Sequence, residues 1–322
     1  MSIDVTTLGE VLIDFTDCGI NEQTGMRLFE QNPGGAPANV ATAVSRLGGK
    51  SAFIGRVGND MHGTFLIDTL SHIGVDTSGI SRDDQAFTTL AFVALSDSGE
   101  RTLSFARKPG ADTRLRPTNV PTALLQNTRI LHFGSLSLTD EPAHHAILHA
   151  IQVAREHHAI IAYDPNDRPL LWPSRAQARE TMRSVLPLVD VIKLSEEECE
   201  ILTGLSEPKQ AAMHLLDMGI QCVVITLGSQ GALVCTASEP DFRLVPGFSV
   251  PVTDTTGAGD AFWGGFLTCL SRSHCQPATL SLQEAAEFAR YGNAVAACNV
   301  QKRGAIPAMP SEQQVQTLLQ TR

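Results

Sequence analysis

The chain has 322 residues, of which 43% are hydrophobic, and its formal net charge is −10. This length and apolar content suffice for a single α/β domain over 1–322. The acidic balance argues against nucleic acid as a partner, and no apolar run of about 18 residues predicts a membrane span. Seven cysteines without a Cys-x-x-Cys pair, and an N-terminus without a leader pattern, predict reduced thiols in a cytoplasmic protein.

Apolar runs typical of strands alternate along the chain with runs typical of helices. The expected strands are 5–9, 52–57, 130–133, 160–163, 189–192 and 222–226. The expected helices between them include 37–47, 63–73, 143–157 and 176–186. This alternation predicts a mostly parallel sheet covered by helices on both faces, with function at the carboxyl ends of the strands.

Two segments, 11–30 and 87–107, depart from that alternation. Their apolar residues repeat with period two, and each segment holds a turn signal: Cys18-Gly19 in one and Asp97-Ser98-Gly99 in the other. These patterns predict hairpins outside the main sheet. A few such strands could form a lid over a site.

The most informative motif is Asp-Thr-Thr-Gly-Ala-Gly-Asp-Ala-Phe at 254–262. A segment of strand composition, 248–253, precedes it, and a helix-like run, 261–270, follows. The glycines at 257 and 259 would therefore lie at a helix N-terminus, where free amides and the helix dipole attract an anion. Asp260 beside that anion could take a proton from an attacking hydroxyl. An ordinary capped helix with an acidic first turn is the alternative.

Polar residues that could bind a small ligand occur near the N-terminus. Asp14 follows the first expected strand, and a carboxylate there could accept two hydrogen bonds from vicinal hydroxyls. Gly34 and Gly35 precede a helix, and Asn39 lies one turn inside it. A simple turn or helix start would explain each of these residues as well.

Two further polar groups follow later in the chain. Arg107 ends an expected lid strand and could close over a substrate, although a surface arginine is usually just solvated. Asn166 and Arg168 follow the strand 160–163, where a polar cluster would lie at the functional edge of the sheet. A turn held by Asx hydrogen bonds is the alternative for this second group.

The sequence resembles the ribokinase-like (PfkB) sugar kinase family over essentially its whole length. The motif at 254–262 is similar to the C-terminal signature of that family, and 32–41 to its N-terminal signature. The segments 9–15 and Arg107-Lys-Pro-Gly-Ala-Asp112 resemble bacterial and plant fructokinases. The resemblance implies a ribokinase-like three-layer α/β fold with a small β lid at 11–30 and 87–107. In such kinases the other face of the lid commonly makes a dimer contact, so a homodimer is expected.

The resemblance also implies roles for individual residues. The catalytic group would be Asp260 as general base, with the anion hole on Gly257, Ala258 and Gly259. The sugar would be bound by Asp14, Gly34, Gly35, Asn39, Phe105, Arg107 and Arg168. The nucleotide would be bound by Asn166, Lys193, Thr226, Gly228, Gly231 and Asn293. The residues alone also fit a plain turn at 226–231 and close helix packing around Asn293.

Two cations are implied beside ATP. Magnesium would be organised by Glu198, through water, and its charge is required to neutralise a transferring γ-phosphoryl group. Ser195 stands where the family usually has Asn, which departs from the usual metal arrangement. Potassium would bind beside the anion hole through the loops that hold Asp254, Thr256 and Gly304.

The sequence thus predicts an ATP-dependent sugar kinase, with fructose as the expected substrate and fructose 6-phosphate as the product. Kinases of 2-keto-3-deoxygluconate, ribose or a nucleoside remain alternatives. The first of these tends to have tyrosines where Phe87 and Phe105 stand. A non-catalytic sugar sensor would not need Asp260, and a purely structural protein would not need Asp14, Arg107 and Asp260 together.

Overall fold

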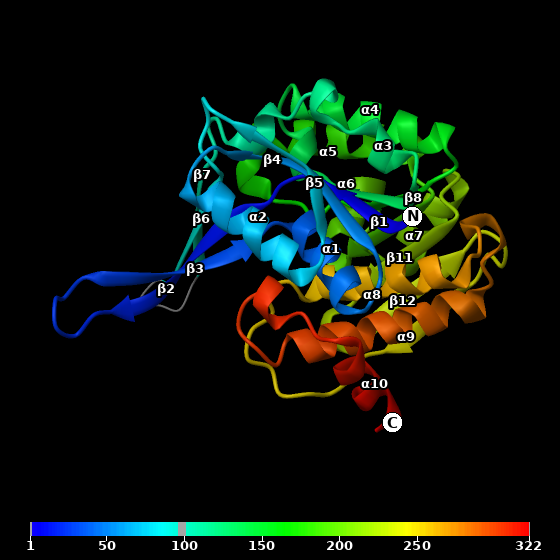
Figure 1. The fold of residues 1–322 in the computed structure, drawn as a ribbon. Helices are drawn as coiled ribbons and strands as arrows, with labels where there is room; N and C mark the ends of the chain where they lie inside the picture. The colour runs from blue at the N-terminus through cyan, green and yellow to red at the C-terminus, as the bar shows by residue number, and fades with distance from the viewer. Residues whose placement is uncertain (1, 96–100, 322) are drawn as a thin grey trace.

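A computed structural model of the protein describes residues 2–95 and 101–321. A nine-stranded sheet lies between layers of helices, and a four-stranded sheet lies to one side (Figure 1). The order in the large sheet is β13 (Phe242–Pro246), β12 (Gly231–Thr236), β11 (Cys222–Thr226), β10 (Val191–Ser195), β9 (Ile160–Asp164), β8 (Thr128–Gly134), β1 (Ile3–Leu8), β4 (Ser51–Gly58) and β5 (Asp76–Asp83).

The large sheet is mostly parallel, as the alternation of apolar runs predicts. All neighbouring strands from β11 to β5 are parallel, whereas β11–β12 and β12–β13 are antiparallel. Helices bury both faces of the parallel part, so side chains of both orientations are apolar. In β11, Val223 and Ile225 join one core cluster, whereas Cys222 and Val224 join the other.

Two layers of helices cover the sheet. One layer packs its apolar side chains on one face of the sheet and consists of α3 (Thr122–Leu125), α4 (Ala143–Glu156), α5 (Arg175–Ser184), α6 (Cys199–Thr203) and α7 (Pro208–Asp217). The opposite layer consists of α1 (Ala36–Arg46), α8 (Ala258–Ser273) and α9 (Leu282–Asn299). Figure 1 shows α3, α4 and α5 above the sheet and α8 and α9 below it. Two more helices complete the body: α2 (Met61–Ile73) packs on β5, and α10 (Glu312–Gln320) packs on α9.

The small sheet is the expected β lid. Its order is β3 (Arg27–Gly34), β2 (Leu12–Ile20), β6 (Leu90–Leu95) and β7 (Arg101–Ala106). The pairs β2–β3 and β6–β7 are antiparallel, as hairpins at 11–30 and 87–107 require, and β2 joins β6 in parallel. The turn predicted at Cys18-Gly19 is wrong: both residues lie within β2, at an irregularity in its pairing with β3, and the chain turns at 21–26. The predicted turn Asp97-Ser98-Gly99 lies outside the described residues. The β2–β3 hairpin extends well beyond the body of the molecule (Figure 1).

The strand expected at 248–253 is wrong. The chain there is irregular, and the real strand, β13, ends at Pro246. Pro251 has no amide hydrogen for a ladder, and the backbone N–H of Thr253 donates instead to Val300 O at the end of α9 (2.8 Å). The segment before the glycine motif is therefore attached to α9.

All seven cysteines are free in the structure, and Cys199, Cys222 and Cys235 are buried. Within residues 2–95 and 101–321, no helix is both long enough and apolar enough to span a membrane.

Candidate active site

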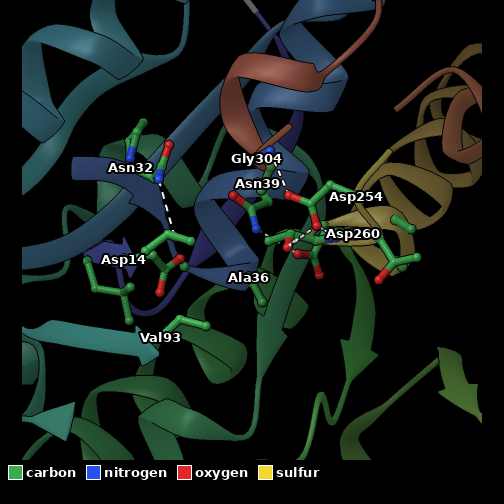
Figure 2. A pocket seen from close by; sticks show the side chains of 18 of the residues that line it. Asp14, Asn32, Ala36, Asn39, Val93, Asp254, Asp260 and Gly304 are labelled. Atoms are coloured by element: carbon green, nitrogen blue, oxygen red, sulfur yellow. Dashed lines mark hydrogen bonds between the residues drawn. The ribbon is translucent and has the colours of Figure 1, made fainter. Parts of the chain in front are cut away.

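A cavity of about 690 Å³ opens where the lid meets the carboxyl ends of the parallel strands. Its walls come from the lid, the start of α1, the loop after β9, the start of α8 and the loop after α9. Figure 2 shows Asp14 on the lid side, Asp254, Asp260 and Gly304 on the opposite side, and Asn39 between them. The chain thus brings its N-terminal and C-terminal motifs to one cavity.

The glycine motif begins α8, as predicted. Gly257 is the N-cap residue with φ 77°, and Gly257, Ala258 and Gly259 all line the cavity. A Cβ on Gly257 would also come within 2.6 Å of Ala305 Cβ, so both the backbone angle and the packing require glycine. The first turn of a sixteen-residue helix therefore faces the cavity. Its free backbone amides and the positive end of the helix dipole suit an anion there.

Asp260 lies in that first turn and is buried at the cavity wall. Asn39 Nδ2 donates to Asp260 Oδ2 (2.7 Å), and Asn166 Nδ2 donates to Oδ1 (3.3 Å). Burial raises the pKa of Asp260 to about 6, although the nearby Lys193 ammonium lowers it. The carboxylate is therefore ionised at neutral pH and is a better proton acceptor than an exposed aspartate.

The cavity wall holds most of the residues expected to bind the sugar. Asp14 on β2, Gly35, Asn39, Phe105 on β7 and Arg168 all line it. Gly34 does not line the cavity, but a Cβ there would collide with Asp14 Oδ2, so glycine makes room for that carboxylate. Burial raises the pKa of Asp14 to about 6, and Arg168 lowers it. Phe87 lies before β6, exposed, and does not line the cavity.

Arg107 does not lie at the cavity wall. Its buried guanidinium forms an ion pair with Asp112 (2.7 Å), and its N–H groups also donate to Leu136 O (2.9 Å) and Thr139 Oγ1 (2.8 Å). The chain turns after β7 and returns to this arginine within five residues, so the side chain packs beneath the lid. The structure thus places the residue expected to face the sugar in a buried polar cluster.

Glu10 lines the cavity and was not among the expected site residues. Its Oε1 accepts a hydrogen bond from the backbone N–H of Ala36 (3.2 Å), the first residue of α1. The N-cap residue Gly35 has no side chain, so Glu10 caps the helix from another part of the chain. Burial raises the pKa of Glu10 to about 7. The sequence does mark Glu10, because it is an acidic residue within an apolar N-terminal segment.

The residues expected to hold potassium do come together. Asp254 Oδ1 accepts hydrogen bonds from the backbone N–H (3.0 Å) and Oγ1 (2.7 Å) of Thr256. Asp254 Oδ2 accepts one from the backbone N–H of Gly304 (2.9 Å). Two loops distant in sequence are thereby joined beside the anion hole, and residues 253–256 and 303–305 line the cavity.

Glu198 lies behind the cavity and is buried. Its carboxylate accepts hydrogen bonds from the backbone N–H groups of Asp167 (2.7 Å) and Ser195 (2.8 Å). Ser195 and Glu198 form a capping box, which gives the serine a structural role in the position of the usual Asn. Glu198 is not among the residues that line the cavity.

The residues expected to bind the nucleotide separate into two groups. Asn166 and Lys193 line the cavity. Thr226, Gly228 and Gly231 form the turn between β11 and β12, beyond the cavity lining. Asn293 Nδ2 donates to the backbone oxygens of Val245 (3.1 Å) and Pro246 (3.2 Å), which connects α9 to β13.

The comparison with known families decides the classification. The model of the pfkB family carbohydrate kinases matches residues 2–312. The chain belongs to this family. Fructokinase-1 of Oryza sativa subsp. japonica is 41% identical over 322 residues, with 98% of each chain covered.

Solved structures agree with the family. A fructokinase from Xylella fastidiosa with bound ATP superimposes with a TM-score of 0.91 at 35% identity, covering 99% of this chain and 98% of that one. A double mutant of the fructokinase from Vibrio cholerae O395, bound to fructose, ADP and potassium, gives a TM-score of 0.86 at 33% identity and covers 99% of each chain. The predicted PfkB membership, ribokinase-like fold and sugar kinase class are confirmed.

Proposed function

We propose that this PfkB kinase transfers the γ-phosphoryl group of ATP to the primary hydroxyl of fructose, forming fructose 6-phosphate. The observation that carries the proposal is that Asp14 on the lid and Asp260 at the start of α8 line one cavity. A sugar held by Asp14 and Asn39 would present a hydroxyl to Asp260. The similarity to plant and bacterial fructokinases over the whole chain supports the choice of sugar.

In this mechanism Asp260 accepts the proton of the attacking hydroxyl. The first-turn amides of α8 stabilise the charge of the phosphoryl group, and Asn39 and Asn166 orient the carboxylate through their hydrogen bonds. Positioning and electrostatics account for most of the catalysis, since phosphoryl transfer requires little other help from the protein. Arg168 at the wall adds positive charge near the reacting groups.

We assign magnesium to the nucleotide phosphates, with Glu198 acting through water, and potassium to the loops around Asp254. Magnesium supplies the charge that neutralises the phosphates when it is bound. The buried carboxylate of Glu198 suits an indirect role, because it lies behind the cavity lining and is held there by two backbone N–H groups. The joined loops of Asp254, Thr256 and Gly304 suit an alkali cation, and potassium is present in the Vibrio relative.

The proposal extends to the assembly and the compartment. The β2–β3 hairpin exposes the apolar side chains of Ile20, Met26, Leu28 and Phe29, which suit contact with the lid of a second copy. The free cysteines suit the reducing conditions of the cytoplasm.

The direct test is ADP formation from Mg-ATP with potassium present, against fructose, 2-keto-3-deoxygluconate, ribose, glucose, tagatose and adenosine. We expect the highest kcat/KM for fructose. A higher kcat/KM for another sugar would support the kinase activity but reject fructose as the substrate. Nucleotide and sugar binding without turnover would favour the sensor.

A further inference from the structure

Two charged residues on neighbouring strands form a buried ion pair below the cavity. Lys193 on β10 and Asp164 at the end of β9 are adjacent in the parallel register, since Ile192 pairs with Tyr163. Lys193 Nζ lies 2.6 Å from Asp164 Oδ2, and the side chains are 6% and 2% exposed. Lys193 also lines the cavity, so the ammonium lies between the acid below it and the site above it.

The ammonium lies directly against the anion hole. A Cβ built on Gly259 would come within 3.1 Å of Lys193 Nζ and 3.7 Å of its Cε. Because Gly259 has no side chain, the Lys193 ammonium can lie close to the first turn of α8. A phosphoryl group on those amides would have this ammonium beside it.

The electrostatic surroundings keep Lys193 charged. Burial alone would lower its pKa, but the carboxylates of Asp164, Glu198 and Asp260 together raise it above its usual value. Without the ammonium, an incoming phosphate would meet this group of carboxylates. Asp164 Oδ1 has no hydrogen-bond partner within the described residues, so Lys193 is the hydrogen-bond partner of this carboxylate there.

Stability alone gives little reason for this pair. A buried ion pair between strands is often no more stabilising than apolar side chains of similar volume. Val191, two residues earlier and on the same face of β10 as Lys193, is apolar and fully buried. A charged pair at the one point where β10 reaches the cavity therefore indicates a catalytic use.

We propose that Asp164 is a positioning residue that holds the Lys193 ammonium against the anion hole, where the ammonium offsets the charge of the transferring phosphoryl group. This inference rests on the proposed kinase function. Asp164 acts on the phosphoryl group through Lys193, and Lys193 contacts the γ-phosphoryl group of ATP.

A double-mutant cycle tests whether the acid acts through the lysine. We expect Asp164→Asn and Lys193→Met each to lower kcat by about 10- to 100-fold. In the Lys193→Met background, Asp164→Asn should change kcat by less than about twofold. The double variant removes both buried charges, so it remains a folded reference even if Lys193→Met alone is unstable. Losses that multiply, or an Asp164→Asn variant within about twofold of wild type, would overturn the proposal.

A second readout needs no sugar and separates this inference from the identity of the substrate. Calorimetric titration with a magnesium complex of a non-hydrolysable ATP analogue, and with Mg-ADP, gives the two affinities for each variant. Asp164→Asn should weaken the ATP analogue by about tenfold more than ADP, because the ammonium faces the γ-phosphoryl position. Equal weakening of both ligands would contradict the proposal. Absence of turnover by the wild type would reject the proposed function, and this comparison would still decide the role of Asp164.

The matched control is Asp83→Asn, which removes another buried acid from ion pairs, with Arg56 and Arg114 (both 2.8 Å). Asp83 ends β5 and does not line the cavity. We expect this variant to lower the unfolding temperature while kcat and the ratio of the two nucleotide affinities stay near wild type. If Asp83→Asn changes that ratio as Asp164→Asn does, the effect is general destabilisation and the proposal fails.

The pH profile gives a third readout, with opposite signs for the two partners. The charged groups acting on Asp260 are Lys193 and Arg168, which lower its pKa, and Asp164, which raises it; Asp14 faces it across the cavity. Lys193→Met should therefore move the acid limb of kcat/KM to higher pH, and Asp164→Asn should move it to lower pH. Shifts of the same sign would contradict the charge assignment.

Discussion

At the residue scale, the two carboxyl groups that face each other across the cavity have the same unusual property. Burial raises the pKa of both Asp14 and Asp260 to about 6. Each group is ionised at pH 7 and becomes neutral about two pH units earlier than an exposed aspartate would. The proposed mechanism needs both as carboxylates, one as hydrogen-bond acceptor and one as base.

The first prediction concerns the pH dependence of the reaction. Because protonation removes both acceptors, kcat/KM should fall as the pH is lowered through about 6, with a limiting slope approaching two on a logarithmic plot. Steady-state rates between pH 5 and 8 with Mg-ATP saturating would show it. A profile that stays flat down to about pH 5 would mean that neither carboxyl has the raised pKa.

Arg107 provides the second prediction, because its buried ion pair suggests a structural rather than a substrate-binding role. Arg107→Met leaves Asp112 buried without its cation, so we expect a loss of about 3 kcal/mol in the free energy of unfolding. The KM for the sugar should change by less than about threefold. Denaturant unfolding and kinetics at a temperature where the variant is folded separate the two roles. Unchanged stability with a strongly raised KM would restore the sequence-based expectation of a sugar contact.

The residues of the site differ in how far sequence could predict them. Asp14, Asn39 and Asp260 lie in motifs whose local structure fixes where they point, and all three line the cavity. Arg107 could not be placed, because its direction depends on Asp112 and on the backbone oxygen of Leu136 after β8. The pairing of Asp164 with Lys193 depends on strand register, which a single sequence does not encode locally.

At the element scale, the lid strands combine two functions. The inner side of β2 carries Asp14 into the cavity, whereas the far end of the β2–β3 hairpin projects from the body (Figure 1). Ile20 and Met26 there are 61% and 69% exposed. Exposed apolar side chains of this kind on a long hairpin lower the solubility of a protein unless a partner covers them.

The third prediction is that this hairpin mediates a homodimer. Ile20→Glu combined with Met26→Glu should convert a dimer into a monomer, because two buried charges would face each other across the contact. Light scattering after gel filtration measures the mass. Met61→Glu, an exposed apolar residue at the start of α2, is the control and should remain dimeric. A monomeric wild type, or dimeric variants, would reject the lid contact.

At the scale of the whole molecule, the periodicity of apolar residues was sufficient to predict the layered fold but not the outer strands of the large sheet. The buried parallel strands appear in sequence as continuous apolar runs, and all six expected ones exist. β5, β12 and β13 were missed. No apolar run marks β5 or β13, whose side chains are mostly exposed or half-buried, whereas β12 is fully buried. The composition of 248–253 instead suggested a strand that tertiary contacts with α9 prevent. Edge strands depend on their neighbours more than on their own sequence.

The fold explains why distant motifs meet in one cavity. The sheet places the ends of β9 and β10 beside the start of α8, and α8 packs on α1, which carries Asn39. The N-terminal and C-terminal signatures are thus joined by the hydrogen bond from Asn39 to Asp260. This hydrogen bond links the sugar-binding and phosphate-binding elements at the catalytic carboxylate.

The central claim is that Asp260 is the catalytic base, and turnover of the Asp260→Asn variant tests it most directly. The amide keeps the shape of the carboxylate and loses its basicity, so we expect a fall in kcat of at least about 100-fold. Fructose affinity, measured by calorimetry, should stay within a few fold of wild type. Turnover close to that of the wild type would contradict the assignment of Asp260 and the mechanism built on it.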